Sequence, residues 1–177
     1  MSKVRLATVW LDGCSGCHMS LLDIDERLLA FAEKAELVYS PLVDTKNFPE
    51  GVDITLVEGA VSTEEDLHKI QLVRERTRIL VSLGDCAVTA NVPGMRNSFG
   101  TKSVADRAYN ENVTIGSGLP CEVVPALLSL VRPVHEVVPV DVFVPGCPPS
   151  ADTIYFVLTE LLEGRKPELS TKTRFGA

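Results

Sequence analysis

Apolar, β-rich segments alternate with helical segments along this chain, and the alternation constrains its fold more than any other feature. Five segments are predicted as strands, at residues 4–11, 37–43, 52–59, 78–84 and 140–146. The first of them, VRLATVWL, is nearly all apolar, which suits a strand covered on both faces of a parallel sheet. Repeated strand-then-helix units predict an α/β fold with a doubly wound parallel sheet and helices on both faces.

Three longer helices are predicted around these strands. The first runs from about residue 19 to residue 34, where four leucines fall on one side of the helix. The second begins at a capping box that we assign to Ser62 and Glu65. The third covers residues 150–164 and ends at Gly164, a residue type typical of the position after a helix.

Length and composition exclude several classes of protein. The chain has 177 residues, of which 45% are hydrophobic and 23% charged, as in ordinary globular proteins. A formal net charge of −7 argues against nucleic acid as a partner, because binding phosphates needs clustered Lys and Arg. An export signal and an apolar stretch of roughly 18 residues, the length that spans a membrane, are both absent from the sequence. We therefore expect a cytoplasmic protein with neither a membrane span nor a nucleic-acid partner.

The chain has the size of one domain, so a single domain is expected over residues 1–177. Residues 91–135 are too long for a simple connection and are predicted as an irregular insertion that provides a functional or docking surface. Residues 165–177 are polar and are predicted as a surface tail.

Four of the five cysteines follow the ends of predicted strands. Cys14 and Cys17 come after the first strand, Cys86 after the fourth and Cys147 after the fifth. Ligands of open α/β sheets gather outside the carboxyl ends of the strands. Buried structural cysteines show no such preference for one edge. We therefore expect these four thiols to converge at one edge of the sheet.

Several kinds of site fit thiols at such an edge. A reducing compartment disfavours structural disulfides, so metal ligation or redox chemistry gains weight. One C-x-x-C pair plus two single cysteines fits a cubane iron-sulfur cluster better than structural zinc, which usually takes two C-x-x-C pairs. A thioredoxin-like dithiol would leave Cys86 and Cys147 unexplained. A flavin carrier also stays open, because such sheets often hold FMN at the same edge.

Glycines and prolines in the cysteine turns support a site. Gly13 and Gly16 allow a positive φ and are expected to let backbone N–H groups point into a cavity. Pro148 and Pro149 fix the chain after Cys147 and suit the start of the helix that follows. Donors aimed at sulfur would offset the negative charge of several thiolates.

Other polar residues near these turns have two interpretations each. His18 is expected either to contact the site or a subunit interface, or to act as a local cap at the start of a helix. Glu58 is expected either to serve at the functional edge or to be a solvated turn carboxylate. Asp12 and Asp85 are expected to turn outward, away from an anionic cluster. Cys121 has no motif around it and is expected to be a buried spare thiol.

Three motifs together carry a family resemblance. They are C-S-G-C after the first strand, G-D-C at residues 84–86 and P-G-C-P-P at residues 145–149. The chain resembles the small subunit of [NiFe] hydrogenases, and LDGCSGCHMSLLDIDERL is most similar to the small subunit of soluble, bidirectional NAD-reducing hydrogenases. The resemblance implies a flavodoxin-like domain in which Cys14, Cys17, Cys86 and Cys147 bind one 4Fe-4S cluster.

The resemblance also implies partners. The nickel-iron centre would belong to a separate large subunit, and a diaphorase module would carry further iron-sulfur centres, FMN and the NAD site. This chain would relay electrons between them without being catalytic alone, and the sequence leaves open whether it binds FMN itself. An iron-sulfur subunit of the complex I type is an alternative, but such subunits have adjacent cysteines where this sequence has Cys14 and Cys17.

Overall fold

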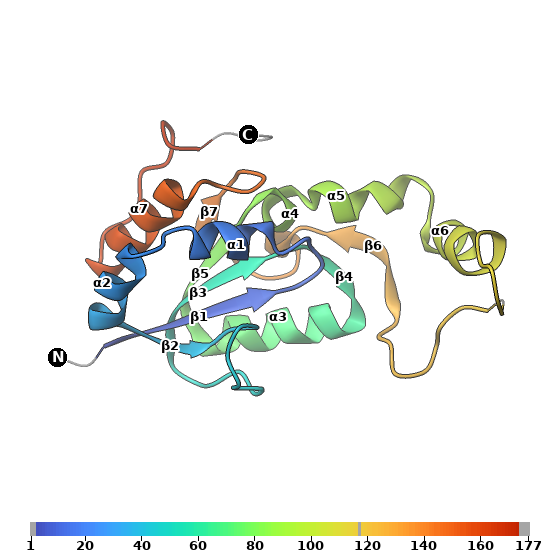
Figure 1. Cartoon of the computed structure of the whole chain (residues 1–177), viewed down its shortest axis with the longest axis horizontal. Helices are drawn as coiled ribbons and strands as arrows, with labels where there is room; N and C mark the ends of the chain where they lie inside the picture. Colours follow the sequence, from blue (N-terminus) through green and yellow to red (C-terminus); the bar gives the residue numbers. More distant parts are fainter. Residues whose placement is uncertain (1–2, 117, 174–177) are drawn as a thin grey trace.

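The computed structural model describes residues 3–116 and 118–173. Its centre is a five-stranded sheet, whose place in the molecule can be followed in Figure 1. Every strand pair in this sheet is parallel, and the strand order is β2-β1-β3-β5-β7. The strands are β1 (Val4–Trp10), β2 (Ala35–Tyr39), β3 (Val52–Glu58), β5 (Thr77–Leu83) and β7 (Val142–Val144). The predicted parallel α/β fold is confirmed.

Helices cover both faces of this sheet, as Figure 1 shows. On one face lie α1 (Gly16–Leu22), α2 (Arg27–Lys34) and α7 (Ala151–Leu162), and on the other lies α3 (Glu64–Arg76). Side chains alternate between the faces along each strand. Leu56 accordingly packs in the core cluster that includes Ile154 of α7, whereas Val57 packs in the cluster that includes Ile70 of α3.

Two predicted boundaries of the first helical region were wrong. The helix expected over residues 19–34 is broken into α1 and α2 by a turn in which Asp25 adopts a left-handed φ of 58°. The strand expected over residues 37–43 begins at Ala35 and ends at Tyr39, because the following residues form a turn in place of continuing the ladder.

The capping box of α3 lies one residue later than predicted. The Thr63 hydroxyl accepts from the Asp66 N–H at 3.1 Å, and the Asp66 carboxylate accepts from the Thr63 N–H at 3.0 Å. Ser62 cannot be the cap because it lies inside the short strand β4 (Val61–Thr63), which delays the start of the helix.

The region 91–135 is more regular than an irregular insertion. Short helical turns form its first part, and these are α5 (Asn91–Gly94), η1 (Met95–Ser98), α6 (Thr101–Asp106) and η2 (Arg107–Glu111). Its second part contains β6 (Leu127–Arg132), which pairs antiparallel with β4, and η3 (Val134–Glu136). We call residues 101–116 and 118–126 the arm, because they extend away from the main sheet in Figure 1.

Candidate metal centre

The four candidate cysteines lie at the carboxyl-terminal edge of the main sheet, which we call the cysteine edge. Cys14 is in the loop between β1 and α1, and Cys17 is in the first turn of α1. Cys86 is in α4 (Asp85–Thr89), directly after β5, and Cys147 is in the turn after β7. Cys17 is buried and Cys86 half-buried, whereas Cys14 and Cys147 are exposed, and all four are free thiols.

The turns that carry these cysteines touch one another. A Cβ atom added to Gly84 would lie only 2.2 Å from Sγ of Cys17, so the start of α4 packs directly against α1. The Asn91 side chain donates to Sγ of Cys147 at 3.7 Å, which links the segment after α4 to the turn after β7. The topology therefore brings residues far apart in sequence together at one edge.

Electrostatic interactions act on two of the four thiols, Cys17 and Cys86. Burial raises the pKa of Cys17 well above its usual range, and Glu58 and the other three thiols raise it further. Burial also raises the pKa of Cys86, against a backbone hydrogen bond from Val92 that lowers it. At Cys17 and Cys86 the edge therefore disfavours bare thiolates, and a bound cation would offset their charge.

The backbone of these turns is unusual in specific places. Gly84 has φ of 83° and Gly146 has φ of 140°, where a Cβ would meet Cα of Pro149 at 2.6 Å. The positive φ expected at Gly13 and Gly16 was wrong, because the left-handed residue of that turn is Ser15, with φ of 64°. Gly16 serves another purpose: its N–H donates to Sγ of Cys14 at 3.4 Å.

Asp85 does not turn outward, and that prediction was wrong. The residue is buried, and its carboxylate accepts from the Gly146 N–H at 2.7 Å while its own N–H donates to the Gly146 carbonyl at 2.9 Å. The start of α4 is thus tied to the turn that leads to Cys147. Asp12 is exposed, as expected.

Glu58 is not a solvated turn carboxylate. It ends β3 with an exposed fraction of 2%, and its two oxygens accept from the N–H of Cys17 at 3.3 Å and of His18 at 2.9 Å. Nδ1 of His18 also contacts the same carboxylate, while Nε2 lies 3.0 Å from the hydroxyl of Thr8. Sequence reasoning missed Thr8, whose only signal is a polar side chain within an apolar strand.

The fifth cysteine lies apart from the others. Cys121 belongs to the arm and is exposed, so the expectation of a buried spare thiol was wrong. Within residues 3–116 and 118–173, no group of three or more His, Cys, Asp or Glu side chains is arranged to hold a metal ion. In the same part of the chain, none of the helices is long and apolar enough to cross a membrane.

The family described as NADH ubiquinone oxidoreductase, 20 Kd subunit, matches residues 14–161. The subunit delta of the NAD-reducing hydrogenase HoxS of Cupriavidus necator is 44% identical over 94% of this chain and 82% of that protein. The chain belongs to the [NiFe] hydrogenase small-subunit family. Complex I-type subunits share the broad family description, so it is the hydrogenase relatives that favour this assignment.

Further comparisons extend the relationship. A protein of an F420-non-reducing hydrogenase of Methanocaldococcus jannaschii is 38% identical over 96% of this chain, which spans 59% of that relative. A chain in the crystal structure of an NAD+-reducing [NiFe]-hydrogenase in the H2-reduced state is 41% identical, with a TM-score of 0.94 over 98% of this chain and 99% of that one. A [NiFeSe]-hydrogenase of Dm. baculatum, 19% identical with a TM-score of 0.61, shares the fold; the match covers 99% of this chain and 70% of that chain.

Proposed function

We propose that this chain is the electron-transfer small subunit of a cytoplasmic, NAD-reducing [NiFe] hydrogenase, and that Cys14, Cys17, Cys86 and Cys147 hold one 4Fe-4S cluster. The observation that carries the proposal is the meeting of three cysteine turns at one edge of the sheet, where the start of α4 packs against Sγ of Cys17 and Asn91 donates to Sγ of Cys147. Similarity to hydrogenase subunits over nearly the whole chain supports the same assignment.

The chemistry of the donor set suits such a cluster, although in the described residues the side chains are not gathered in the arrangement of a metal site. Four thiolates are its usual ligands, and a bound cluster supplies a centre that accepts and releases single electrons. Gly84 leaves the space that Sγ of Cys17 occupies, since any Cβ there would collide with the sulfur. The N–H of Gly16 and the amide of Asn91 already donate to Sγ of Cys14 and of Cys147, and such donors stabilise thiolate ligands.

A large subunit is the partner that we place over the cysteine edge. Cys14 and Cys147 are exposed, and beside them Trp10 and Met19 expose 44% and 58% of their surface. Exposed apolar side chains next to an electron-transfer site are typical of a protein interface. Covering this edge would shield the cluster from water and bring the large subunit's nickel-iron centre close to it.

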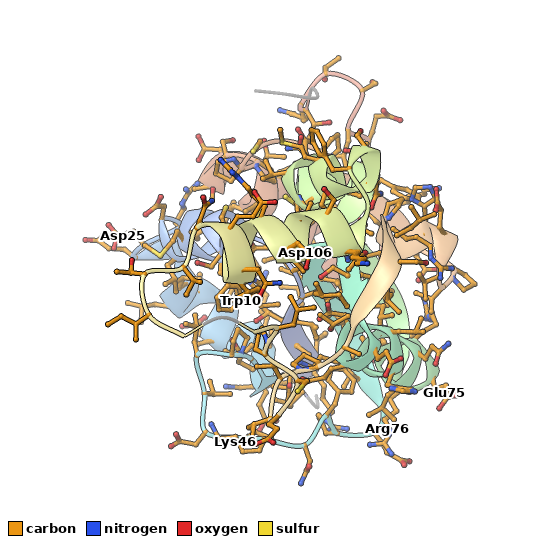
Figure 2. All side chains as sticks on the ribbon, turned by 90° about the vertical axis from the view of Figure 1, so that its right-hand side faces the viewer. Trp10, Asp25, Lys46, Glu75, Arg76 and Asp106 are labelled. Atoms are coloured by element: carbon orange, nitrogen blue, oxygen red, sulfur yellow. The ribbon has the colours of Figure 1, made fainter. Side chains whose placement is uncertain are left out.

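The arm supplies further apolar surface for the same partner. In Figure 2, which views the molecule from the right-hand side of Figure 1, α6 with Asp106 lies at the front, toward the viewer. The arm exposes several large apolar side chains: Tyr109, Val113, Ile115, Leu119, Val123 and Val124. We assign this surface to the large subunit, and we assign the onward transfer of electrons to a diaphorase module that carries FMN and the NAD site.

Purification without oxygen, together with a co-expressed large subunit, tests the proposal. We expect brown protein with about four iron atoms per chain and nickel in the partner, whereas the chain alone should neither take up nor evolve hydrogen. Cys86→Ser and Cys147→Ser should lower the iron content, and Cys121→Ser, the matched control in the arm, should not. Colourless protein with one zinc, or yellow protein with flavin and no iron, would contradict the assignment.

A further inference from the structure

Glu58 presents a puzzle that the proposed function does not resolve. Its carboxylate is buried at the cysteine edge, against the backbone of Cys17, although burying a negative charge is costly unless donors satisfy it. Donors do surround it: the backbone N–H groups of Cys17 and His18 reach its two oxygens, and the His18 ring contacts it as well. These N–H groups satisfy both oxygens of the buried side chain.

A series of buried polar contacts continues from the His18 ring toward β1 and β2. Nε2 of His18 lies 3.0 Å from the hydroxyl of Thr8 in β1, and Thr8 donates to the hydroxyl of Ser40, just after β2, at 2.8 Å. All of these residues are buried. Glu58 and His18 therefore join three neighbouring strands to the C-x-x-C turn.

Resting on the proposed function, we propose that Glu58 is a positioning residue for the cluster: it clamps the Cys17 turn to β3, and its negative charge keeps the cluster's reduction potential low. Reduction adds an electron close to this carboxylate, and like charges in a poorly solvated site repel strongly. The same residue thus serves both geometry and potential.

Glu58 interacts electrostatically with two of the candidate ligands, Cys17 and Cys86. After burial, Glu58 is the largest cause that raises the pKa of Cys17, and it also raises the pKa of Cys86. The Glu58 carboxylate contacts the backbone of Cys17 directly, so its charge would lie close to a cluster held by that ligand and would disfavour an added electron there. Exposed carboxylates act differently, because water screens them.

Glu58→Gln in the full chain, purified without oxygen in its complex, separates the two roles. Its amide oxygen still accepts from a backbone N–H, so the iron content should stay near that of the wild type. Without the charge, the ratio of reduced to oxidised cluster at a fixed applied potential should rise about tenfold, which is about 59 mV for a one-electron couple. The ratio is measured by electron paramagnetic resonance during a redox titration.

Asp12→Asn is the matched control, because Asp12 is an exposed carboxylate at the same edge. In Asp12→Asn, the ratio of reduced to oxidised cluster at the same applied potential should stay within about twofold of the wild-type ratio. Glu58→Asp keeps the charge but is one methylene shorter, so it should bind less iron at an unchanged midpoint. If Glu58→Gln does not fold, as judged by circular dichroism, a wild-type midpoint in Glu58→Asp supports the proposal, and a tenfold shift overturns it.

The outcomes distinguish this inference from the proposed function. A wild-type chain without iron would refute both. An iron-loaded wild type whose midpoint is unchanged by Glu58→Gln would refute only the role of Glu58, and so would an equal shift in the Asp12 control.

Discussion

The two edges of the main sheet contain different kinds of residues and interactions. The cysteine edge contains the left-handed residues Ser15 and Gly84 and the buried carboxylates of Glu58 and Asp85. The opposite edge, where the strands begin, contains ion pairs with solvent-accessible side chains. These pairs are Arg76 with Glu50 at 3.4 Å, Arg78 with Asp53 at 3.3 Å and Arg74 with Asp141 at 2.7 Å.

The comparison shows that strained backbone conformations lie at the cysteine edge, where the candidate site is. Residues in sparsely populated backbone conformations cost on the order of 1–3 kcal/mol each and cluster at functional sites. Exposed ion pairs, in contrast, contribute roughly 0–1 kcal/mol. Substitutions of the strained and buried residues at the cysteine edge should therefore be costly and affect the metal centre, whereas substitutions at the opposite edge should cost little and leave it intact.

The largest effect is expected from Gly84→Ala. Its Cβ would collide with Sγ of Cys17, and the positive φ would add strain of about 1 kcal/mol. We take the collision to weaken cluster binding by about 1.4 kcal/mol, which is a tenfold change in an equilibrium constant. The iron content should then fall to about a tenth of the wild-type value. Iron analysis after anaerobic purification measures this.

Gly100→Ala is the control for that experiment. Gly100 has nearly the same φ, 79°, but nothing lies within 4 Å of an added Cβ. It should lose about 1 kcal/mol of unfolding free energy from backbone strain and keep its iron. Equal iron loss in the two variants would mean that backbone strain, not contact with Cys17, explains the effect.

Asp85→Ala should have the next largest effect. The substitution removes the acceptor of the Gly146 N–H in a buried site, so the free energy of unfolding should fall by about 1–3 kcal/mol. Urea denaturation of the metal-free chain measures the change. Asp85→Asn keeps an acceptor oxygen and should recover part of the loss, whereas Asp12→Ala should be nearly neutral. An Asp85→Ala variant as stable as the wild type would remove the distinction between the edges.

Much of the fold and the place of the cysteines could be predicted from the sequence, because local patterns encode them. Apolar strands such as VRLATVWL mark the layers of a parallel sheet, and the topology then brings the cysteine turns to one edge. β6 was missed because most of it is exposed and it pairs outside the main sheet, so it lacks a clear period of burial.

The surroundings of the cysteines could not be predicted in this way. The donors to Glu58 come from residues about forty positions earlier, so no local pattern marks this carboxylate as buried. Asp85 is buried for the same kind of reason, since its acceptor oxygen faces Gly146, 61 positions later. Ser15 adopts a conformation that we expected of its neighbouring glycines, because only the packed turn decides which residue takes the positive φ.

At the opposite edge, Asp141→Asn should have a moderate, pH-dependent effect. Burial alone would raise the pKa of Asp141, but hydrogen bonds from the Leu80 N–H and from Arg74, each 2.7 Å long, lower it below its usual value. A lowered folded pKa stabilises the protein above the unfolded pKa, about 3.9, and the contribution is lost as the pH falls through the folded value.

Asp141 is nearly half exposed, so solvent screening limits its contribution to about 1 kcal/mol at pH 7. Urea denaturation of Asp141→Asn and wild type should show this difference at pH 7 and a smaller one near pH 3. A difference that grows on acidification would contradict the assigned sign. The iron content should not change, because the residue lies at the edge away from the cysteines.

Arg78→Gln should have the smallest effect. The Arg78 side chain is 65% exposed, and its partner Asp53 keeps a hydrogen bond from the Arg5 N–H at 2.9 Å when the guanidinium is removed. We expect a loss of at most about 0.5 kcal/mol, abolished in 1 M salt because ions screen exposed pairs at this distance. Urea denaturation at low and high salt measures both. A loss of unfolding free energy as large as that of Asp85→Ala would mean that the exposed ion pairs at the edge where the strands begin stabilise the protein more than we expect. Charge, more than burial, would then explain the difference between the two edges.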